Sequence, residues 1–158
     1  MREASKRTLI IVHSWHHRST EKVARAMAAE LCAEVKSPQD ARPEELAACD
    51  LIGFGAGIDS GRHYAPLLAF AEALPDTQQK KAFIFSTSAL VSDRKIAKDH
   101  AALRRILTAK GYVVLDEFAC KGYNTNSFLK YLGGMNNGRP NAEDLQAAGA
   151  FARSLAKY

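Results

Sequence analysis

Residues 9–21 have the sequence Leu-Ile-Ile-Val-His-Ser-Trp-His-His-Arg-Ser-Thr-Glu, an apolar run that stops at a polar, partly basic turn. Apolar residues at helical spacing predict that a helix follows the turn: Val23, Ala26, Met27 and Leu31. A buried strand that leads through a hydroxyl-rich turn into a helix favours anion binding, because unpaired backbone N–H groups and the helix dipole face the turn. The stretch therefore predicts an anion site.

The turn offers the hydroxyls of Ser14, Ser19 and Thr20 and the guanidinium of Arg18. These groups would hold a phosphomonoester through charge-assisted hydrogen bonds. The alternative is that Ser19 or Thr20 only caps the helix. Thr20 lacks the glutamate that completes a capping box three residues later, because Val23 stands there. Capping and phosphate binding are compatible with each other.

Short apolar runs alternate with helical stretches along the whole chain. Strands are expected at 8–13, 33–36, 50–55, 81–86 and 112–120. Helices are expected at 21–32, 63–74, 93–110 and 142–157, with a short helical turn opened by Pro43. Asn141 or Asn136 is the candidate cap of the last helix. The alternation predicts one α/β domain over 1–158, a three-layer α/β/α sandwich with a five-stranded parallel sheet, and the continuous apolar runs are typical of strands covered on both faces.

Composition and charge exclude several classes of protein. Apolar residues make up 47% of the chain, but no run approaches the roughly 18 residues of a membrane span, and no signal peptide is expected, so we expect a cytoplasmic protein. The net charge of +5 is scattered rather than gathered in a stripe with aromatics, so nucleic acid is not expected as a partner. Three cysteines form no CxxC motif and are expected as reduced thiols in or near the core: Cys32, Cys49 and Cys120.

In an open α/β sheet, a ligand binds beyond the carboxyl ends of the strands. Four predicted loops meet at that edge: 14–20, 56–64, 87–93 and 121–126. The stretch Gly55-Ala56-Gly57-Ile58-Asp59-Ser60-Gly61 leads into the second loop, and its glycines permit positive φ and close approach of a flat ligand, with an ordinary turn as the alternative. The small residues of Ser86-Thr87-Ser88-Ala89 leave room for a ring system at the third loop.

The order and spacing of these loops resemble the flavodoxin-like family. The resemblance runs through 9–20, 50–58 and 83–88, and residues 133–141 are similar to a tail of stand-alone flavodoxin-related proteins. It implies the sheet order 2-1-3-4-5 and an FMN at the carboxyl ends of the strands. By position, the first loop would hold the FMN phosphate through Ser14, His16, His17, Arg18, Ser19 and Thr20. The second and third loops would contact the ring and ribityl chain through Ala56, Gly57, Ile58, Thr87, Ser88 and Ala89.

The sequence departs from the family pattern at two places. The family's phosphate loop is T-x-T-G-x-T, and the four fixed places here hold Trp15, His17, Arg18 and Thr20. The loop at 87–93 has no aromatic residue to cover the flavin. Three aromatics are candidates to stack instead, each with ordinary core or surface packing as its alternative: Tyr64, Tyr123 and Trp15.

Four of the five histidines fall at the predicted binding edge: His13, His16, His17 and His63. They have three interpretations: metal ligands, groups that make phosphate or substrate binding depend on pH, or plain polar loop residues. The metal interpretation lacks an accompanying carboxylate cluster, and no metal is expected. Cys120 ends the fifth strand near the same edge and is interpreted as structural, because Lys121 next to it points to the opposite face.

These observations predict an FMN-binding redox protein that passes electrons to a partner protein or a small-molecule acceptor. Electron-shuttling flavodoxins tend to be acidic, so a basic chain implies different, acidic partners or an enzyme. One alternative is a flavin-dependent NAD(P)H:quinone or porphyrinogen-type oxidoreductase, although no GxGxxG motif is present. The other is a cofactor-free interaction module with the same fold, which the two departures favour.

Overall fold

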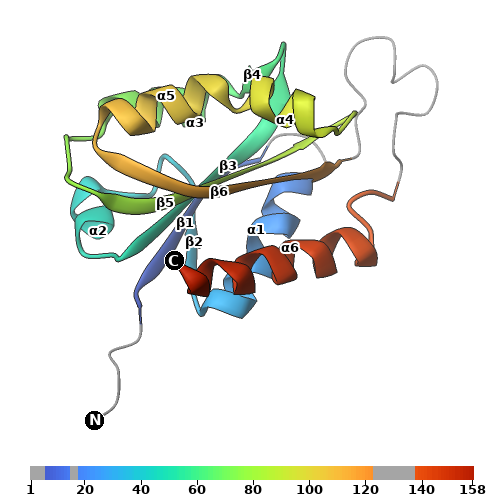
Figure 1. The fold of residues 1–158 in the computed structure, drawn as a ribbon, viewed down its shortest axis with the longest axis horizontal. Helices are drawn as coiled ribbons and strands as arrows, with labels where there is room; N and C mark the ends of the chain where they lie inside the picture. Colours follow the sequence, from blue (N-terminus) through green and yellow to red (C-terminus); the bar gives the residue numbers. More distant parts are fainter. Residues whose placement is uncertain (1–5, 15–17, 123–137) are drawn as a thin grey trace.

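The computed structural model describes residues 6–14, 18–122 and 138–158. Five strands form a parallel sheet in the order β2-β1-β3-β5-β6, and the short β4 pairs antiparallel with β3 (Figure 1). Without β4 this order is 2-1-3-4-5, so the predicted topology is confirmed. The strands are β1 (Thr8–His13), β2 (Glu34–Lys36), β3 (Leu51–Asp59), β4 (Arg62–His63), β5 (Lys80–Ser88) and β6 (Tyr112–Lys121).

Helices cover both faces of the sheet, which confirms the three-layer arrangement (Figure 1). On one face, α1 (Ser19–Leu31) packs against α6 (Ala142–Ser154), which continues into a 3₁₀ turn, Leu155–Lys157. The opposite face carries the other helices: α2 (Pro43–Ala47), α3 (Ala65–Ala73), α4 (Asp93–Asp99) and α5 (Ala101–Ala109).

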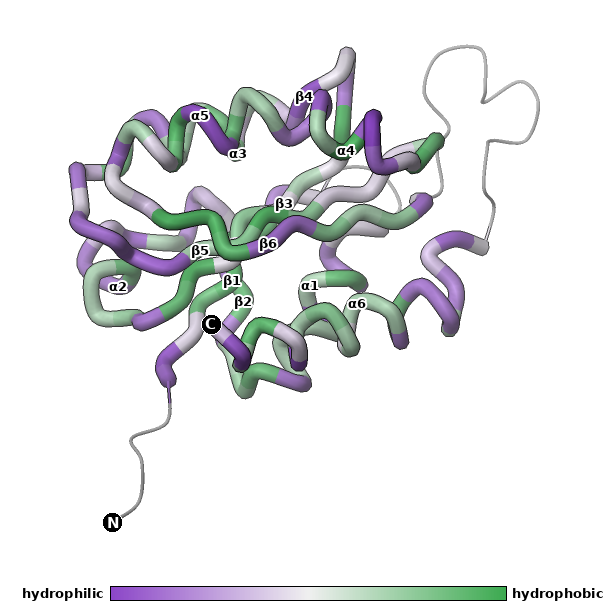
Figure 2. Tube along the Cα trace, in the orientation of Figure 1, coloured by the Kyte–Doolittle hydropathy of each residue, from purple (hydrophilic) through white to green (hydrophobic). Residues whose placement is uncertain are grey.

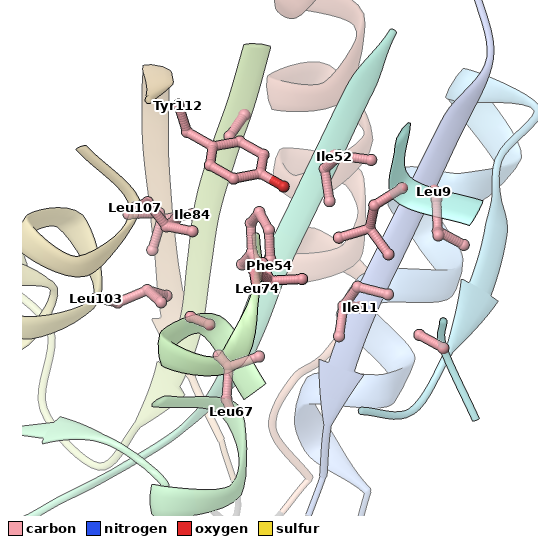
Figure 3. Packing of buried hydrophobic residues seen from close by; sticks show 14 of the residues in the cluster. Leu9, Ile11, Ile52, Phe54, Leu67, Leu74, Ile84, Leu103, Leu107 and Tyr112 are labelled. Atoms are coloured by element: carbon pink, nitrogen blue, oxygen red, sulfur yellow. The ribbon is translucent and has the colours of Figure 1, made fainter. Parts of the chain in front are cut away.

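Alternating side chains of the strands build a separate core on each face, because successive residues of a strand point to opposite sides. The core beneath α3 and α5 includes Leu9, Ile11, Ile52, Phe54, Ile84, Leu67, Leu103 and Leu107 (Figure 3). The core beneath α1 and α6 includes Ile10, Val12, Phe83, Phe85, Val23, Met27, Ala148 and Ala152. Figure 2 shows hydrophobic residues gathered along the strands, and hydrophilic residues in the turns and interspersed along the helices.

Three glycines of β3 leave space in which aromatic rings of the same chain pack against the strand. A Cβ at Gly53 would lie 2.3 Å from the Phe83 ring, and one at Gly55 would lie 2.2 Å from the Phe85 ring. A Cβ at Gly57 would lie 2.6 Å from the Tyr64 ring. The protein's own side chains therefore make close approaches at these three glycines, and the contact of Gly57 with a flavin stays a prediction.

β6 contains a one-residue bulge. It pairs with β5 in regular register up to Val114 and again from Asp116, which leaves Leu115 as an extra residue on β6. A bulge of this kind reverses the in–out alternation of the residues that follow it. Glu117 consequently faces α5, where its carboxylate accepts hydrogen bonds from Arg104.

The predicted helix at 93–110 is broken at His100. This residue ends α4 and precedes α5 with φ −87° and ψ −6°, and its ring is fully buried. The last helix begins as predicted, because the Asn141 side chain accepts the N–H of Asp144 at 3.0 Å; the other candidate cap, Asn136, lies outside the described residues.

All three cysteines are free thiols, and Cys49 and Cys120 are buried as expected. The expectation is wrong for Cys32, which is exposed because it is the C-cap residue of α1 at the end of the helix. Among the described residues, no helix has the length and apolar character needed to cross a bilayer.

Candidate functional site

Arg18 stands at the start of α1, where the sequence predicts the anion site. It is the N-cap residue and adopts the left-handed conformation, with φ 52° and ψ 32°. Glycine enters this region readily, whereas other residues enter it at a steric cost. Arg18 therefore supplies a backbone shape suited to glycine, at the place where the sequence departs from T-x-T-G-x-T. Its side chain is 81% exposed and lies 3.7 Å from Glu21, a weak surface pair.

The first turn of α1 has backbone donors that no described residue satisfies. Within the described part of the chain no side chain caps the helix. Ser19 and Thr20 follow the N-cap residue Arg18, lie inside the first turn and are buried, so the interpretation of either as the cap is wrong. The N–H of Glu21 lies 3.4 Å from Ser14 Oγ, but no described residue accepts the N–H of Ser19 or Thr20. Such groups at the positive end of a helix dipole suit a phosphate.

The side chain of Thr20 joins α1 to β5. Its Oγ1 lies 2.8 Å from Oγ1 of Thr87 in a buried hydrogen bond. Gly122 closes the same corner, since a Cβ there would lie 3.0 Å from the Ser19 Cβ and 3.1 Å from the Thr87 Cβ. The N–H of Gly122 donates to the Ser88 carbonyl at 3.0 Å. The first, third and fourth predicted loops thus converge at one edge of the sheet.

Replacing either threonine of the buried pair by valine is expected to destabilise the protein by about 1–3 kcal/mol, because the remaining hydroxyl loses its partner. The double variant Thr20→Val, Thr87→Val should cost less than the sum of the two single variants, since it leaves no orphaned hydroxyl. Urea denaturation followed by circular dichroism measures all four proteins. Strict additivity would contradict the coupling.

The second predicted loop, 56–64, is a β-hairpin instead of a loop. β3 continues to Asp59, and Ile58 pairs with His63 of β4. Positive φ at both Ser60 (54°) and Gly61 (80°) forms the tight turn that joins the two strands. The expectation of a loop at 56–64 is therefore wrong. A two-residue turn in which both φ values are positive matches the twist of the flanking strands, so β3 continues as a strand up to the turn.

Tyr64 covers the inner end of this hairpin. Its ring lies against Gly57, as noted above, and meets the His13 ring edge-on with centroids 6.0 Å apart. Its N–H donates to the Gly57 carbonyl at 3.0 Å. Tyr64 is therefore placed at the predicted edge. The other two stacking candidates, Trp15 and Tyr123, lie outside the described residues, as do the phosphate candidates His16 and His17.

The third loop is held by short polar contacts. Ser88 Oγ donates to the Leu90 carbonyl at 2.7 Å, and Ser92 Oγ accepts the N–H of Lys95 at 3.2 Å, which caps α4. Leu90 is 56% exposed. Ala89 lies between these contacts, so the segment from Thr87 to Ala89 presents small side chains and backbone at the edge.

A chain of polar side chains, which the sequence did not predict, lies beneath the end of β5, with Ser86 and His100 buried and Glu117 and Arg104 partly buried. We call it the relay: Ser86, His100, Glu117 and Arg104. Ser86 Oγ lies 2.7 Å from His100 Nε2, and His100 Nδ1 lies 2.8 Å from Glu117 Oε1. Arg104 donates to both carboxylate oxygens of Glu117, at 2.6 and 2.7 Å. Burial raises the pKa of Glu117, but hydrogen bonds from His100 and Arg104 outweigh it and lower that pKa to about 2.

His63 lies beside the relay, with its ring centroid 4.8 Å from that of His100. Its Nε2 donates to the Phe85 carbonyl at 3.0 Å, and its buried Nδ1 has no hydrogen-bond partner among the described residues. Burial and the nearby His100 lower the pKa of His63 to about 3. His63 is therefore neutral and buried, and the interpretation of it as a solvated loop residue is corrected.

The described residues at this edge provide neither a reactive thiolate nor a metal site. Burial and the charge of Asp144 raise the pKa of Cys120 to about 12, so Cys120 is a thiol rather than a thiolate. Within 6–14, 18–122 and 138–158, no three His, Cys, Asp or Glu side chains gather as a metal site requires.

No family model matches the chain. An uncharacterized protein of Methanocaldococcus jannaschii is 40% identical over 151 residues, which cover 96% of this chain and 99% of the relative. Oxidised flavodoxin 2 from Bacillus cereus superposes with a TM-score of 0.72 at 18% identity, over 96% of this chain and 98% of that one. A flavodoxin, WrbA-like protein from Agrobacterium tumefaciens superposes with a TM-score of 0.68 at 20% identity, over 97% and 96% of the two chains.

Proposed function

The chain belongs to one family with the uncharacterized protein of Methanocaldococcus jannaschii and has the flavodoxin-like fold, and from this premise we propose that it binds FMN non-covalently and passes electrons through it. The observation that carries the proposal is the start of α1, where left-handed Arg18 precedes N–H groups that no described residue accepts. A bound FMN would supply the redox chemistry, and the protein would supply binding, orientation and electrostatics. The three free thiols are consistent with the reducing cytoplasmic setting that is part of the proposal.

In this proposal, the FMN phosphate is held at the start of α1 by Ser14, Arg18, Ser19 and Thr20, together with His16 and His17 of the same loop. The ring and ribityl chain are contacted by residues that end β3 and β5: Ala56, Gly57, Ile58, Thr87, Ser88 and Ala89. Tyr64 covers Gly57 at this edge and shields that part of the backbone from water. The net charge of +5 favours an acidic redox partner or a small anionic acceptor.

Titration of free FMN with the purified protein tests the proposal. We expect quenching of flavin fluorescence with a micromolar or tighter dissociation constant, and a melting temperature that rises with FMN concentration, because a ligand that binds only the native state stabilises it. A protein with no bound flavin, no quenching and an unchanged melting temperature would be the cofactor-free interaction module. Steady NAD(P)H consumption with a quinone, above the free-FMN background, would instead identify the oxidoreductase.

Arg18→Glu is expected to weaken FMN binding by roughly ten- to a hundredfold, because it removes a charge-assisted contact and places a carboxylate beside the phosphate. Arg105→Glu is the matched control, since it makes the same change of charge at an exposed position of α5. Fluorescence quenching compares the two variants with the wild type. Equal affinity in Arg18→Glu and Arg105→Glu would remove Arg18 from the phosphate site.

A further inference from the structure

When the His100 ring is neutral, each hydrogen bond of the relay has only one possible direction. Glu117 is ionised and only accepts, so His100 Nδ1 carries a proton and donates to it. In the neutral ring, His100 Nε2 then holds the lone pair and accepts the hydroxyl proton of Ser86. Arg104 holds the carboxylate from the far side with two hydrogen bonds. The relay thus fixes the His100 tautomer and the Ser86 rotamer together.

The same end of β5 is held by two further side chains. His63 donates to the carbonyl of Phe85, and Thr20 pairs with Thr87. Three consecutive residues, 85–87, are therefore fixed by side chains from β4, from the α4–α5 junction and from α1. The order Ser–His–Glu is that of a hydrolase triad, but Ser86 is 1% exposed and therefore closed to a substrate.

We propose that His63 and the relay residues Ser86, His100 and Glu117 are positioning residues of the cofactor edge, which hold β5 so that Thr87, Ser88 and Ala89 meet the FMN. This inference rests on the proposed function. The neutral His63 and the ionised Glu117–Arg104 pair place no uncompensated charge beneath the edge. The preformed backbone lowers the ordering cost of binding, which is how a residue that never contacts a ligand raises its affinity.

The test uses FMN titration of the full-length wild type, Ser86→Ala, Glu117→Gln and the double variant. We expect each single variant to weaken FMN binding by about tenfold, the lower end of the loss seen when a supporting hydrogen-bond partner is removed from a metal site. The double variant should be little weaker than either single one, because the relay acts as a unit. Ser86→Thr, which keeps a hydroxyl on Cβ, should restore most of the affinity. Glu45→Gln, which removes the remote Lys36–Glu45 contact, is the control and should bind as the wild type does.

Nitrogen NMR of the histidine rings gives a second readout that needs no FMN. In the unliganded wild type, the proton should lie on Nδ1 of His100 and on Nε2 of His63. The reverse tautomer of His100 would overturn the relay. Wild-type affinity in Ser86→Ala and Glu117→Gln, with wild-type FMN binding intact, would overturn the positioning role alone. A wild type that does not bind FMN at all would overturn the proposed function, and this inference with it.

Discussion

Lowering the pH from 6.5 toward 3 is expected to reduce the free energy of unfolding by about 1.4 kcal/mol per pH unit through His63 alone. The pKa of His63 is about 3 in the folded protein and 6.5 in a solvated chain. Between these values the unfolded state binds a proton that the folded state excludes, so stability falls as the pH falls. The slope fades as the pH rises through 6.5, and well above that value both states are neutral and His63 contributes none.

His63→Gln is expected to remove this slope. The glutamine amide can donate to the Phe85 carbonyl in place of the ring, and it does not titrate. His13→Gln is the control: burial also lowers the pKa of His13, but its ring is partly exposed, so most of the wild-type slope should remain. Urea denaturation at a series of pH values measures the slopes. The series stays above pH 4.5, because below that value the protonation of Glu117 in the unfolded chain adds its own loss of stability. Parallel curves for His63→Gln and the wild type would refute the assignment.

Gly55→Ala is expected to destabilise the protein by about 1–3 kcal/mol, because the core must yield to an extra methyl group. The added Cβ would lie 2.2, 2.3 and 2.5 Å from three atoms of the Phe85 ring, which is fully buried and has no room to withdraw. Displacing Phe85 also disturbs the carbonyl that His63 binds. The effect should therefore appear in FMN affinity as well as in stability.

A double-variant cycle separates the clash between the methyl group added at Gly55 and the Phe85 ring from the change in backbone freedom that any Gly→Ala replacement causes. Phe85→Leu shortens the side chain over Gly55, so it should cost less in the Gly55→Ala background than in the wild type. Gly149→Ala in α6 is the control, since its nearest contact would be an ordinary 3.4 Å to the Glu30 Cγ and alanine favours a helix. Additive costs for the first pair would argue against the clash.

The fold was predictable because its main signals are local. Continuous apolar runs identified the buried parallel strands, and the first predicted strand agrees with β1, Thr8–His13, at both ends. The hairpin after β3 was missed because Ile58 and His63 pair only once the turn at Ser60 and Gly61 exists. The break at His100 was missed because helical periodicity continues across it, from α4 into α5.

The candidate site was predictable only in part. Topology placed Ser19, Thr20 and Thr87 at one edge, and the structure brings them together. Topology could not predict the relay, because its members come from separate elements and share no motif spacing. A usable signal was present nonetheless: Asp116 and Glu117 are adjacent charged residues inside a largely apolar strand, so whichever of them faces a covered side of the sheet requires a partner.

The bulge at Leu115 decides which residues in the second half of β6 point to each face of the sheet. If the same residues ran in strict alternation, the Glu117 carboxylate would turn toward α6 and the Phe118 ring would turn toward His100. That exchange would bury a charge against hydrocarbon and leave a histidine facing an aromatic ring in place of its acceptor. One surplus residue thus allows a single strand to present an acid to one layer and an aromatic to the other, so the spacing along β6 is as much a part of the relay as the identity of its members.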